Sequence, residues 1–209
     1  MNSIEKLTQI FSEFPGIGPR QAKRFVYFLL TRQNGALEEL SKNILDLKNQ
    51  VSVCSECMRF YEKKHDKSRV CNICGDHTRD QSTLMIVQRD IDLTSIEKNG
   101  NFNGIYFVLG GSVPILEKEP DKKIRTSELK TFVQKKSKNG LREIILGMNW
   151  NPEGENTASY VESIFRKILS KDIDSGTIKI SHLGKGLSMG TELEYIDPDT
   201  LKNALKNRN

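Results

Sequence analysis

Four cysteines in two pairs are the residues with the clearest chemistry in this sequence of 209 residues. They follow the pattern Cys-x-x-Cys, thirteen intervening residues, Cys-x-x-Cys, and their numbers are Cys54, Cys57, Cys71 and Cys74. Each pair offers two thiolates from one tight turn, and two such turns facing each other form a tetrahedral sulfur site that suits Zn²⁺. An iron–sulfur centre is a competing interpretation, and a redox dithiol is a weaker one. Because cysteine fills all four ligand positions, we expect one structural zinc ion per chain and no open position for catalysis.

A second chemical pattern is a turn near the start of the chain, between two stretches with helical apolar spacing. Gly16 and Gly18 alternate in this turn, and the absence of a Cβ atom lets their backbone approach a phosphate closely. The following helix directs its free N–H groups and the positive end of its dipole at that phosphate. Arg20, Lys23 and Arg24 add positive charge along the same helix. The pattern predicts salt-sensitive contact with DNA that ignores base sequence, although an ordinary corner between two helices also uses glycines.

The distribution of charge favours a polyanionic partner more than the net charge of +5 does, although any one of the local surpluses taken alone is more typical of a solvated face. Residues 1–36 carry five Lys/Arg against two acids, residues 58–69 carry five against two, and residues 117–138 carry eight against four. Mean hydropathy is −0.51, and no apolar run approaches the roughly 18 residues of a membrane helix. The first residues lack the basic end and apolar block of a signal peptide. We therefore expect a cytoplasmic, nucleoid-associated protein with no membrane partner and with reduced thiols.

Apolar spacing predicts the elements that position these residues. Helices are expected over 3–13, from Pro19 to Leu30 and around 37–47. Short apolar runs at 84–87, 105–109, 144–146 and 177–180 are typical of strands buried on both faces, and helical patterns at 91–98, 127–138 and 154–169 lie between them. This alternation predicts a mostly parallel α/β sheet. Residues 111–126 are expected to form an exposed loop, and residues 198–207 a final helix.

The elements predict a multi-module α/β chain with four parts. These are a helix–hairpin–helix domain (1–52), a four-cysteine zinc module (53–80), an α/β domain (81–178) and a C-terminal closing segment (179–209). We expect the last segment to contact another subunit. Its glycine-rich stretch, residues 184–190 with Lys185, lacks the lysine–serine ending of a phosphate-binding loop and therefore gives no support to nucleotide hydrolysis.

The order of these patterns resembles the RecR family of bacterial recombination mediators. The likeness rests on the hairpin PGIGPRQAKR, the cysteine quartet, and the later stretches YFVLGG (106–111), NPEGENTA (151–158), LGKGLSMG (183–190) and LEY (193–195). It runs from about residue 5 to residue 208 in family order. The resemblance implies a Toprim-type α/β domain and a tetrameric ring that clamps single- or double-stranded DNA. Such rings work with RecO and RecF to load recombinase onto single-stranded DNA. The resemblance also implies DNA contact by Arg20, Lys23 and Arg24, and RecO binding at Glu153 and Glu155.

Two regions depart from the usual family pattern. The spacer between the cysteine pairs is longer than usual, and its Lys63, Lys64, Lys67 and Arg69 either extend a basic surface or form a solvated loop. Gln88 stands where the first Toprim strand usually ends in glutamate. The Asp-x-Asp pair of Toprim enzymes corresponds to Asn149 and Asn151.

A Mg²⁺-dependent phosphoryl-transfer enzyme of topoisomerase, primase or nuclease type is the alternative function. Mg²⁺ requires carboxylate oxygens, and Gln88, Asn149 and Asn151 are neutral. Glu153 and Glu155 have a simpler explanation, because acids at the start of a helix complement its dipole. We therefore predict a DNA-binding recombination mediator without catalytic residues. A zinc scaffold that binds no DNA is a third hypothesis, but it leaves the basic hairpin unexplained.

Overall fold

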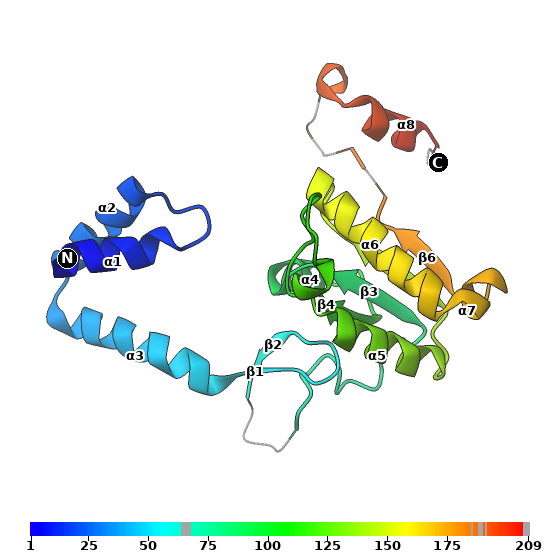
Figure 1. Cartoon of the computed structure of the whole chain (residues 1–209), viewed down its shortest axis with the longest axis horizontal. Coiled ribbons are helices and arrows are strands. Elements are labelled where there is room, and N and C mark those ends of the chain that lie inside the picture. The colour runs from blue at the N-terminus through cyan, green and yellow to red at the C-terminus, as the bar shows by residue number, and fades with distance from the viewer. Residues whose placement is uncertain (64–67, 185, 188–189, 191, 207–209) are drawn as a thin grey trace. The chain divides into compact units, whose positions relative to one another are not determined.

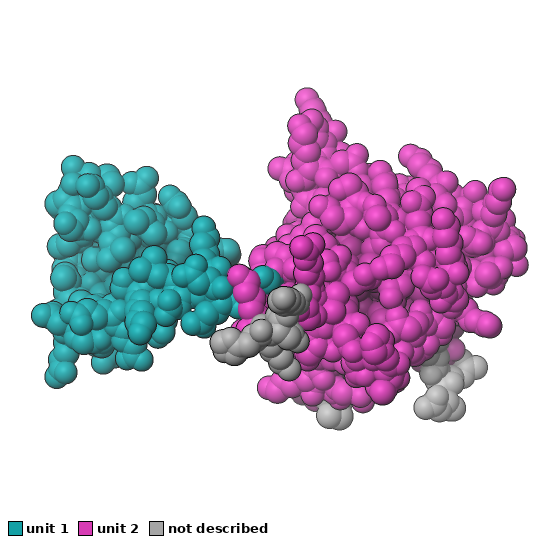
Figure 2. All heavy atoms as spheres, turned by 90° about the horizontal axis from the view of Figure 1, so that it is seen from below, with its two compact units in different colours: residues 1–52 teal, residues 53–209 magenta. Residues whose placement is uncertain are grey.

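The computed structural model describes residues 1–63, 68–184, 186–187, 190 and 192–206 (Figure 1). The chain forms two compact units, Met1–Ser52 and Val53–Asn209 (Figure 2). None of the helices in the described residues is long and apolar enough to cross a membrane.

The first unit consists mainly of three helices and has a small core. It comprises α1 (Ser3–Ser12), α2 (Pro19–Leu30) and α3 (Asn34–Gln50), which confirms the three predicted helices. Helix α1 begins in a capping box, in which the side chains and backbone N–H groups of Asn2 and Glu5 bond reciprocally at 2.9 and 3.0 Å. Ala22 and Val26 of α2 are the buried residues of the unit, and Phe11 packs edge-on against Phe25 with ring centroids 6.0 Å apart.

The second unit begins with the cysteine-bearing segment. Strands β1 (Val51–Val53) and β2 (Phe60–Glu62) pair in a two-stranded sheet around the first cysteine pair. The sequence did not indicate either strand, because three residues are too few to show alternation of apolar and polar side chains.

A four-stranded parallel sheet forms the centre of the second unit, as the alternation of strands and helices predicted. Its strands are β3 (Thr83–Val87), β4 (Ile105–Val108), β5 (Glu143–Gly147) and β6 (Lys179–His182), in the spatial order β4-β3-β5-β6. All three pairings are parallel, and Leu84 lies between Ile105 and Ile144. The helices between the strands are α4 (Asp90–Asn99), α5 (Thr126–Ser137), α6 (Pro152–Ile168) and the short α7 (Ser170–Asp174). The carboxyl ends of the four strands therefore share one edge of the sheet.

Both faces of this sheet are buried, but by different partners. Helices α5 and α6 cover one face, where Leu84, Ile86 and Phe107 pack with Leu129, Val161 and Phe165. The opposite face carries Met85, Val87, Tyr106 and Val108, and these pack with Leu93 of α4 and with Cys54, Cys57, Cys71 and Ile73. The cysteine segment is thus the second core layer of the α/β sheet. This explains why the strands read as continuous apolar runs.

The remaining segments differ from expectation in one place. Residues 111–126 contain a 3₁₀ turn, η1 (Pro120–Lys122), and bury Val113 and Ile124 rather than forming a wholly exposed loop. Near the C-terminus, η2 (Leu193–Tyr195) precedes α8 (Pro198–Lys206), which confirms the last predicted helix up to residue 206. Lys185 and parts of the glycine-rich stretch lie outside the described residues, as do Lys64, Lys67 and Asn207.

Candidate nucleic-acid interface and metal centre

The turn between α1 and α2 delivers the chain directly into the start of α2. The N–H of Ile17 donates to the carbonyl of Phe14 at 3.0 Å and closes the turn. Gly16 has a φ of +76°, which L side chains rarely adopt, so glycine is required there. Gly18 is extended, with φ −82° and ψ 166°, and it is followed by Pro19 at the first helical position.

The start of α2 has no side-chain cap. Gly18 occupies the N-cap position and offers no side-chain acceptor, so the N–H groups of Arg20 and Gln21 receive no bond from a capping side chain. A Cβ atom placed on Gly18 would meet nothing within 4 Å. The packing of the chain therefore leaves room for a side chain at Gly18. The glycine keeps the approach to these N–H groups open to an external acceptor.

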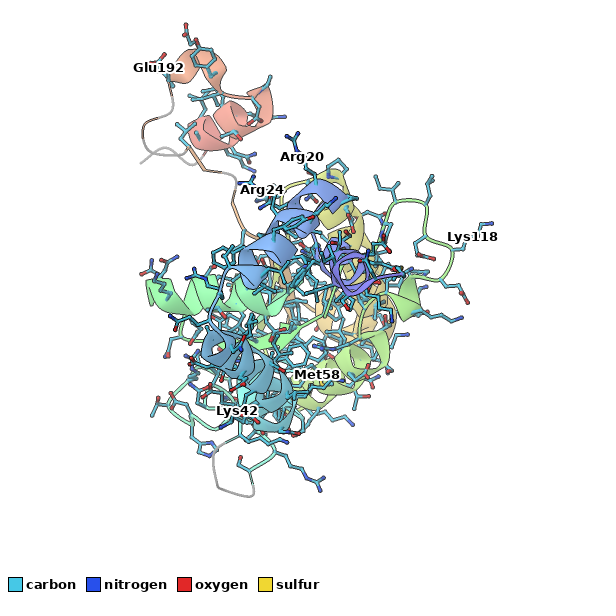
Figure 3. The ribbon with its side chains drawn as sticks, turned by 90° about the vertical axis from the view of Figure 1, so that its left-hand side faces the viewer. Arg20, Arg24, Lys42, Met58, Lys118 and Glu192 are labelled. Atoms are coloured by element: carbon cyan, nitrogen blue, oxygen red, sulfur yellow. The ribbon has the colours of Figure 1, made fainter. Side chains whose placement is uncertain are left out.

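The basic side chains next to this helix start are exposed. Arg20, Lys23 and Arg24 are all exposed on α2. Figure 3 labels two of them, Arg20 and Arg24. Arg24 donates to the amide oxygen of Gln21 at 3.4 Å. Among the described residues, no carboxylate lies within ion-pairing distance of Arg20, Lys23 or Arg24. Their positive charge is therefore available to an anionic ligand.

The structure brings the four predicted metal ligands together. The Sγ atoms of Cys54, Cys57, Cys71 and Cys74 all lie within 4.8 Å of one another, and Cys57 Sγ is 3.6 Å from Cys71 Sγ. Three of the side chains are buried and Cys74 is half-buried. The backbone N–H of Cys71 donates to Cys54 Sγ at 3.3 Å, an arrangement that favours a thiolate at Cys54.

The thiols of this cluster cannot all ionise by themselves. Hydrogen bonding between Cys57 and Cys54 lowers the pKa of Cys54 and raises the pKa of Cys57. Four thiolates at these distances repel one another strongly unless a cation lies among them. The donor set therefore fits a divalent, sulfur-preferring metal ion.

Backbone and side-chain hydrogen bonds attach the cysteine turns to the sheet. The N–H of Val108, at the end of β4, donates to the carbonyl of Cys57 at 2.9 Å. Arg125 donates to the carbonyl of Met58 and, at 3.2 Å, to the carbonyl of Val108. Asp90 accepts from the N–H of Phe60 at 2.7 Å. The metal ligands thus belong to the framework of the α/β domain.

Three neutral residues lie at the carboxyl edge of the sheet: Gln88, Asn149 and Asn151. The side chains of Gln88 and Asn151 accept backbone hydrogen bonds, and Asn149 is exposed. Gln88 is 3% exposed, and its amide oxygen accepts the backbone N–H of Asn149 at 3.1 Å, which ties the end of β3 to the end of β5. The side-chain oxygen of Asn151 caps α6 by accepting the N–H of Gly154 at 2.7 Å. Among the described residues, the cysteine quartet is the only group of three or more His, Cys, Asp or Glu side chains close enough to share a metal ion.

Glu153 and Glu155 lie in the first turn of α6, and both are exposed. Glu153 accepts a hydrogen bond from the hydroxyl of Ser112. Thr157 accepts the N–H of Val113 at 2.9 Å, and the Asn156 amide donates to the carbonyl of Val113 at 2.9 Å. These bonds hold the loop after β4 against α6. Sequence reasoning missed this role of Glu153, because the two segments are far apart in the chain.

Known proteins resemble the chain over nearly its whole length. Residues 4–48 match the family described as RecR, helix-hairpin-helix; residues 82–178 match the Toprim domain; and residues 186–209 match RecR, C-terminal. Recombination protein RecR of Chloroherpeton thalassium is 33% identical over 208 residues, covering 99% of this chain and 96% of that protein. The proteins of the same name from Lactobacillus helveticus and Lactococcus lactis are 33% and 32% identical, each over 98% of this chain and 96% of its own length. The predicted fold class, with its hairpin, cysteine cluster and Toprim domain, is confirmed.

Proposed function

The chain belongs to the RecR family of recombination proteins, and on this premise we propose that it binds DNA as a non-catalytic mediator of recombinational repair. The observation that carries this proposal is the start of α2, where uncapped N–H groups lie beside three exposed basic side chains with no carboxylate partner among the described residues. Gly16 shapes the turn, Gly18 leaves space for a phosphate, and Arg20, Lys23 and Arg24 neutralise it.

Contacts of this kind read the DNA backbone and carry no sequence information. Specificity then has to come from encirclement or from partners. We propose that the chain forms a tetrameric ring that clamps single- or double-stranded DNA. In this proposal the ring acts with RecO- and RecF-type proteins to load recombinase onto single-stranded DNA, and the RecO-type partner binds at the start of α6, where Glu153 and Glu155 lie.

Zinc is the ion that we propose for the cysteine cluster. A tetrahedron with Zn–S bonds of about 2.3 Å has edges of about 3.8 Å, close to the 3.6 Å between Cys57 and Cys71. Sulfur atoms this close together leave little room for a cluster of several iron atoms and their sulfides. An ion held by four cysteines has no free coordination position, so its role is structural.

The carboxyl edge of the sheet supports a non-catalytic function. The side-chain oxygens of Gln88 and Asn151 both accept hydrogen bonds from backbone N–H groups. Neither side chain carries the negative charge that Mg²⁺ requires. Glu153, the nearest acid in the sequence, is engaged by Ser112. Phosphoryl transfer would need carboxylates at positions where this chain has amides.

The DNA contact is tested by changing Arg20 and Arg24 together to alanine. We expect affinity for a short single strand and for a duplex to fall by at least about tenfold at low salt, and the slope of log K against log salt to fall by about two. Fluorescence anisotropy at several salt concentrations measures both, with the RecO-type partner absent and then present.

The matched control changes Lys42 and Lys48 of α3 to alanine, which removes the same charge from exposed positions outside the hairpin. This control should keep most of the salt slope. Equal losses of DNA affinity in the two double variants would show that only the total charge of the chain matters. An unchanged salt slope in the Arg20 and Arg24 variant would show that the hairpin is not the DNA site.

The metal assignment is tested by elemental analysis of the purified protein. We expect about one zinc per chain and a colourless product. Changing Cys57 to serine should abolish zinc retention and lower the melting temperature of the whole second unit, because Cys57 packs in the same core cluster as β3 and β4. A brown, redox-active protein would identify iron instead.

A further inference from the structure

The outer side of helix α2 carries two aromatic side chains that the core of the first unit does not use. The inner side of this helix holds the buried Ala22 and Val26. Tyr27 and Phe28 are 50% and 51% exposed. At about 100° per residue, both project more than a quarter turn away from the buried pair. Their rings therefore face an external ligand rather than the core.

Basic residues lie on the same outer side of the helix. Lys23 lies one turn before Tyr27, and Arg24 lies one turn before Phe28, so each pair shares a stripe of the helix surface. All four side chains are exposed. Residues 14–37 contain four basic residues and no acidic one. This surface thus combines positive charge with aromatic rings.

Arg32 extends this surface just beyond the end of α2. Its guanidinium carbon lies 4.2 Å from the centroid of the Phe28 ring, within the range of a cation–π contact. Its backbone N–H donates to the carbonyl of Leu29 at 3.0 Å, which keeps the residue next to the last helical turn. In the part of the chain that the structure describes, no carboxylate lies within ion-pairing distance of Arg32. The ring and the guanidinium together form a flat cationic surface.

Single-stranded DNA fits this combination better than a duplex or an acidic peptide does. Every base has a π-face, and sites for single strands combine aromatic rings for the bases with positive charge for the phosphates. The bases of a duplex are already stacked on one another and do not reach the rings. An acidic peptide would neutralise the basic residues but would leave the rings exposed.

The length of the helix also suits a nucleotide chain. With a rise of about 1.5 Å per residue, Phe28 lies about 14 Å from the first residue of α2. A strand stacked as in a duplex covers this span in about four nucleotides. We propose that a single strand of DNA runs along the outer side of α2, with its bases stacked on Tyr27 and Phe28. This inference rests on the proposed function, because it continues the DNA contact at the start of the same helix.

The first experiment removes the ring of Phe28 from the full-length chain. We expect F28A to weaken binding of a short oligothymidylate at least about fivefold, the lower end of what stacking of a base on an aromatic side chain contributes. Duplex affinity and the salt slope should stay the same, because no charge changes. F28W should restore the single-strand affinity, whereas F28L, which is apolar but not aromatic, should not. Fluorescence anisotropy measures all of these.

Two controls separate stacking from other effects of the change. L30A removes an equally apolar side chain from the same helix, where Leu30 is 62% exposed, and it should leave both affinities unchanged. An abasic strand keeps the phosphates but has no bases. The unchanged chain should bind this strand more weakly than the normal one, and F28A should bind it no more weakly than the unchanged chain does.

The second experiment locates the contact directly. A single strand that carries 5-iododeoxyuridine forms a covalent bond, on irradiation, to an aromatic side chain stacked on the modified base. Trypsin cleaves after Arg24 and Arg32, so we expect the cross-linked peptide to be residues 25–32, with the DNA attached at Tyr27 or Phe28. Cross-links found only in other peptides would overturn the proposal.

The affinities of F28A can also overturn the proposal. An unchanged single-strand affinity, or equal losses for single strand and duplex, would show that no base stacks on Phe28. A changed oligomeric state of F28A in sedimentation velocity would assign the ring to a contact between subunits instead. If the unchanged chain binds no DNA, with or without the RecO-type partner, the proposed function itself fails. If it binds DNA and F28A binds equally well, only the stacking surface fails.

Discussion

The starts of helices α2 and α6 use the same backbone arrangement for opposite charges. Both helices have proline at the first helical position after an extended N-cap residue. The N-cap of α2 is Gly18, which leaves the N–H groups without a side-chain cap, and Arg20 follows in the first turn. The N-cap of α6 is Asn151, which bonds the N–H of Gly154, and Glu153 and Glu155 follow.

This difference shows that a helix start becomes an anion site only when the side chains around it permit one. The partial positive charge at the N-terminus is the same in both helices. At α6 a capping side chain and two carboxylates use that charge within the chain. At α2 glycine and exposed basic residues leave it available. The comparison therefore supports the proposal that DNA binds at the start of α2 and not at the start of α6.

An acidic cap on α2 should make its start resemble that of α6 and should cause the larger of the two expected effects. In G18D the new carboxylate can bond the N–H groups of the first turn and repel a phosphate, and the open space at Gly18 accommodates it. We expect DNA affinity to fall about tenfold, the equivalent of one lost charged contact, while the melting temperature stays equal or rises slightly.

The control for this variant is G35D in α3, where a Cβ also meets nothing within 4 Å. The same anisotropy titration serves both proteins, and G35D should bind DNA nearly as the unchanged chain does. If G18D and G35D bind equally well, the uncapped helix start makes no contribution to DNA binding.

Removing the side-chain cap of α6 should have a smaller effect, and this effect should be on stability rather than on DNA binding. Changing Asn151 to alanine leaves the N–H of Gly154 without its side-chain acceptor, and we expect the free energy of unfolding to fall by about 1 kcal/mol. Urea unfolding measures this loss, and N151D should restore most of the stability because aspartate caps equally well. DNA affinity should be unchanged in N151A, and a clear loss would mean that α6 contributes to the DNA site.

The sequence predicted most of the regular elements because their signals are local. The apolar spacing around Ala22 and Val26 and the apolar runs of β3, β4 and β5 follow directly from helical and strand periods. The grouping of the four cysteines also followed from their spacing, since each pair spans one turn. Strands β1 and β2 were missed because they are only three residues long.

The position of the cysteine segment could not be predicted in this way. Its buried Cys57 and Ile73 pack on Met85 and Val87 of β3, and the bonds from Val108 and Arg125 fasten it to the sheet. The sequence predicted a separate zinc module at residues 53–80 with a surplus of basic residues. Packing between segments that are separate in the chain decides whether such a module stands alone or completes a core.

The sequence by itself determined the sulfur donor set of the cysteines and the neutral charge of Gln88 and Asn151. It also led to the prediction that the hairpin binds phosphate. These inferences depend only on single residues and short turns. Only the tertiary structure decided what those groups contact. Gln88 ties two strand ends together, and Glu153 holds the loop after β4 against α6. Each of these contacts joins segments distant in the chain, and the folding of the sheet brings them together.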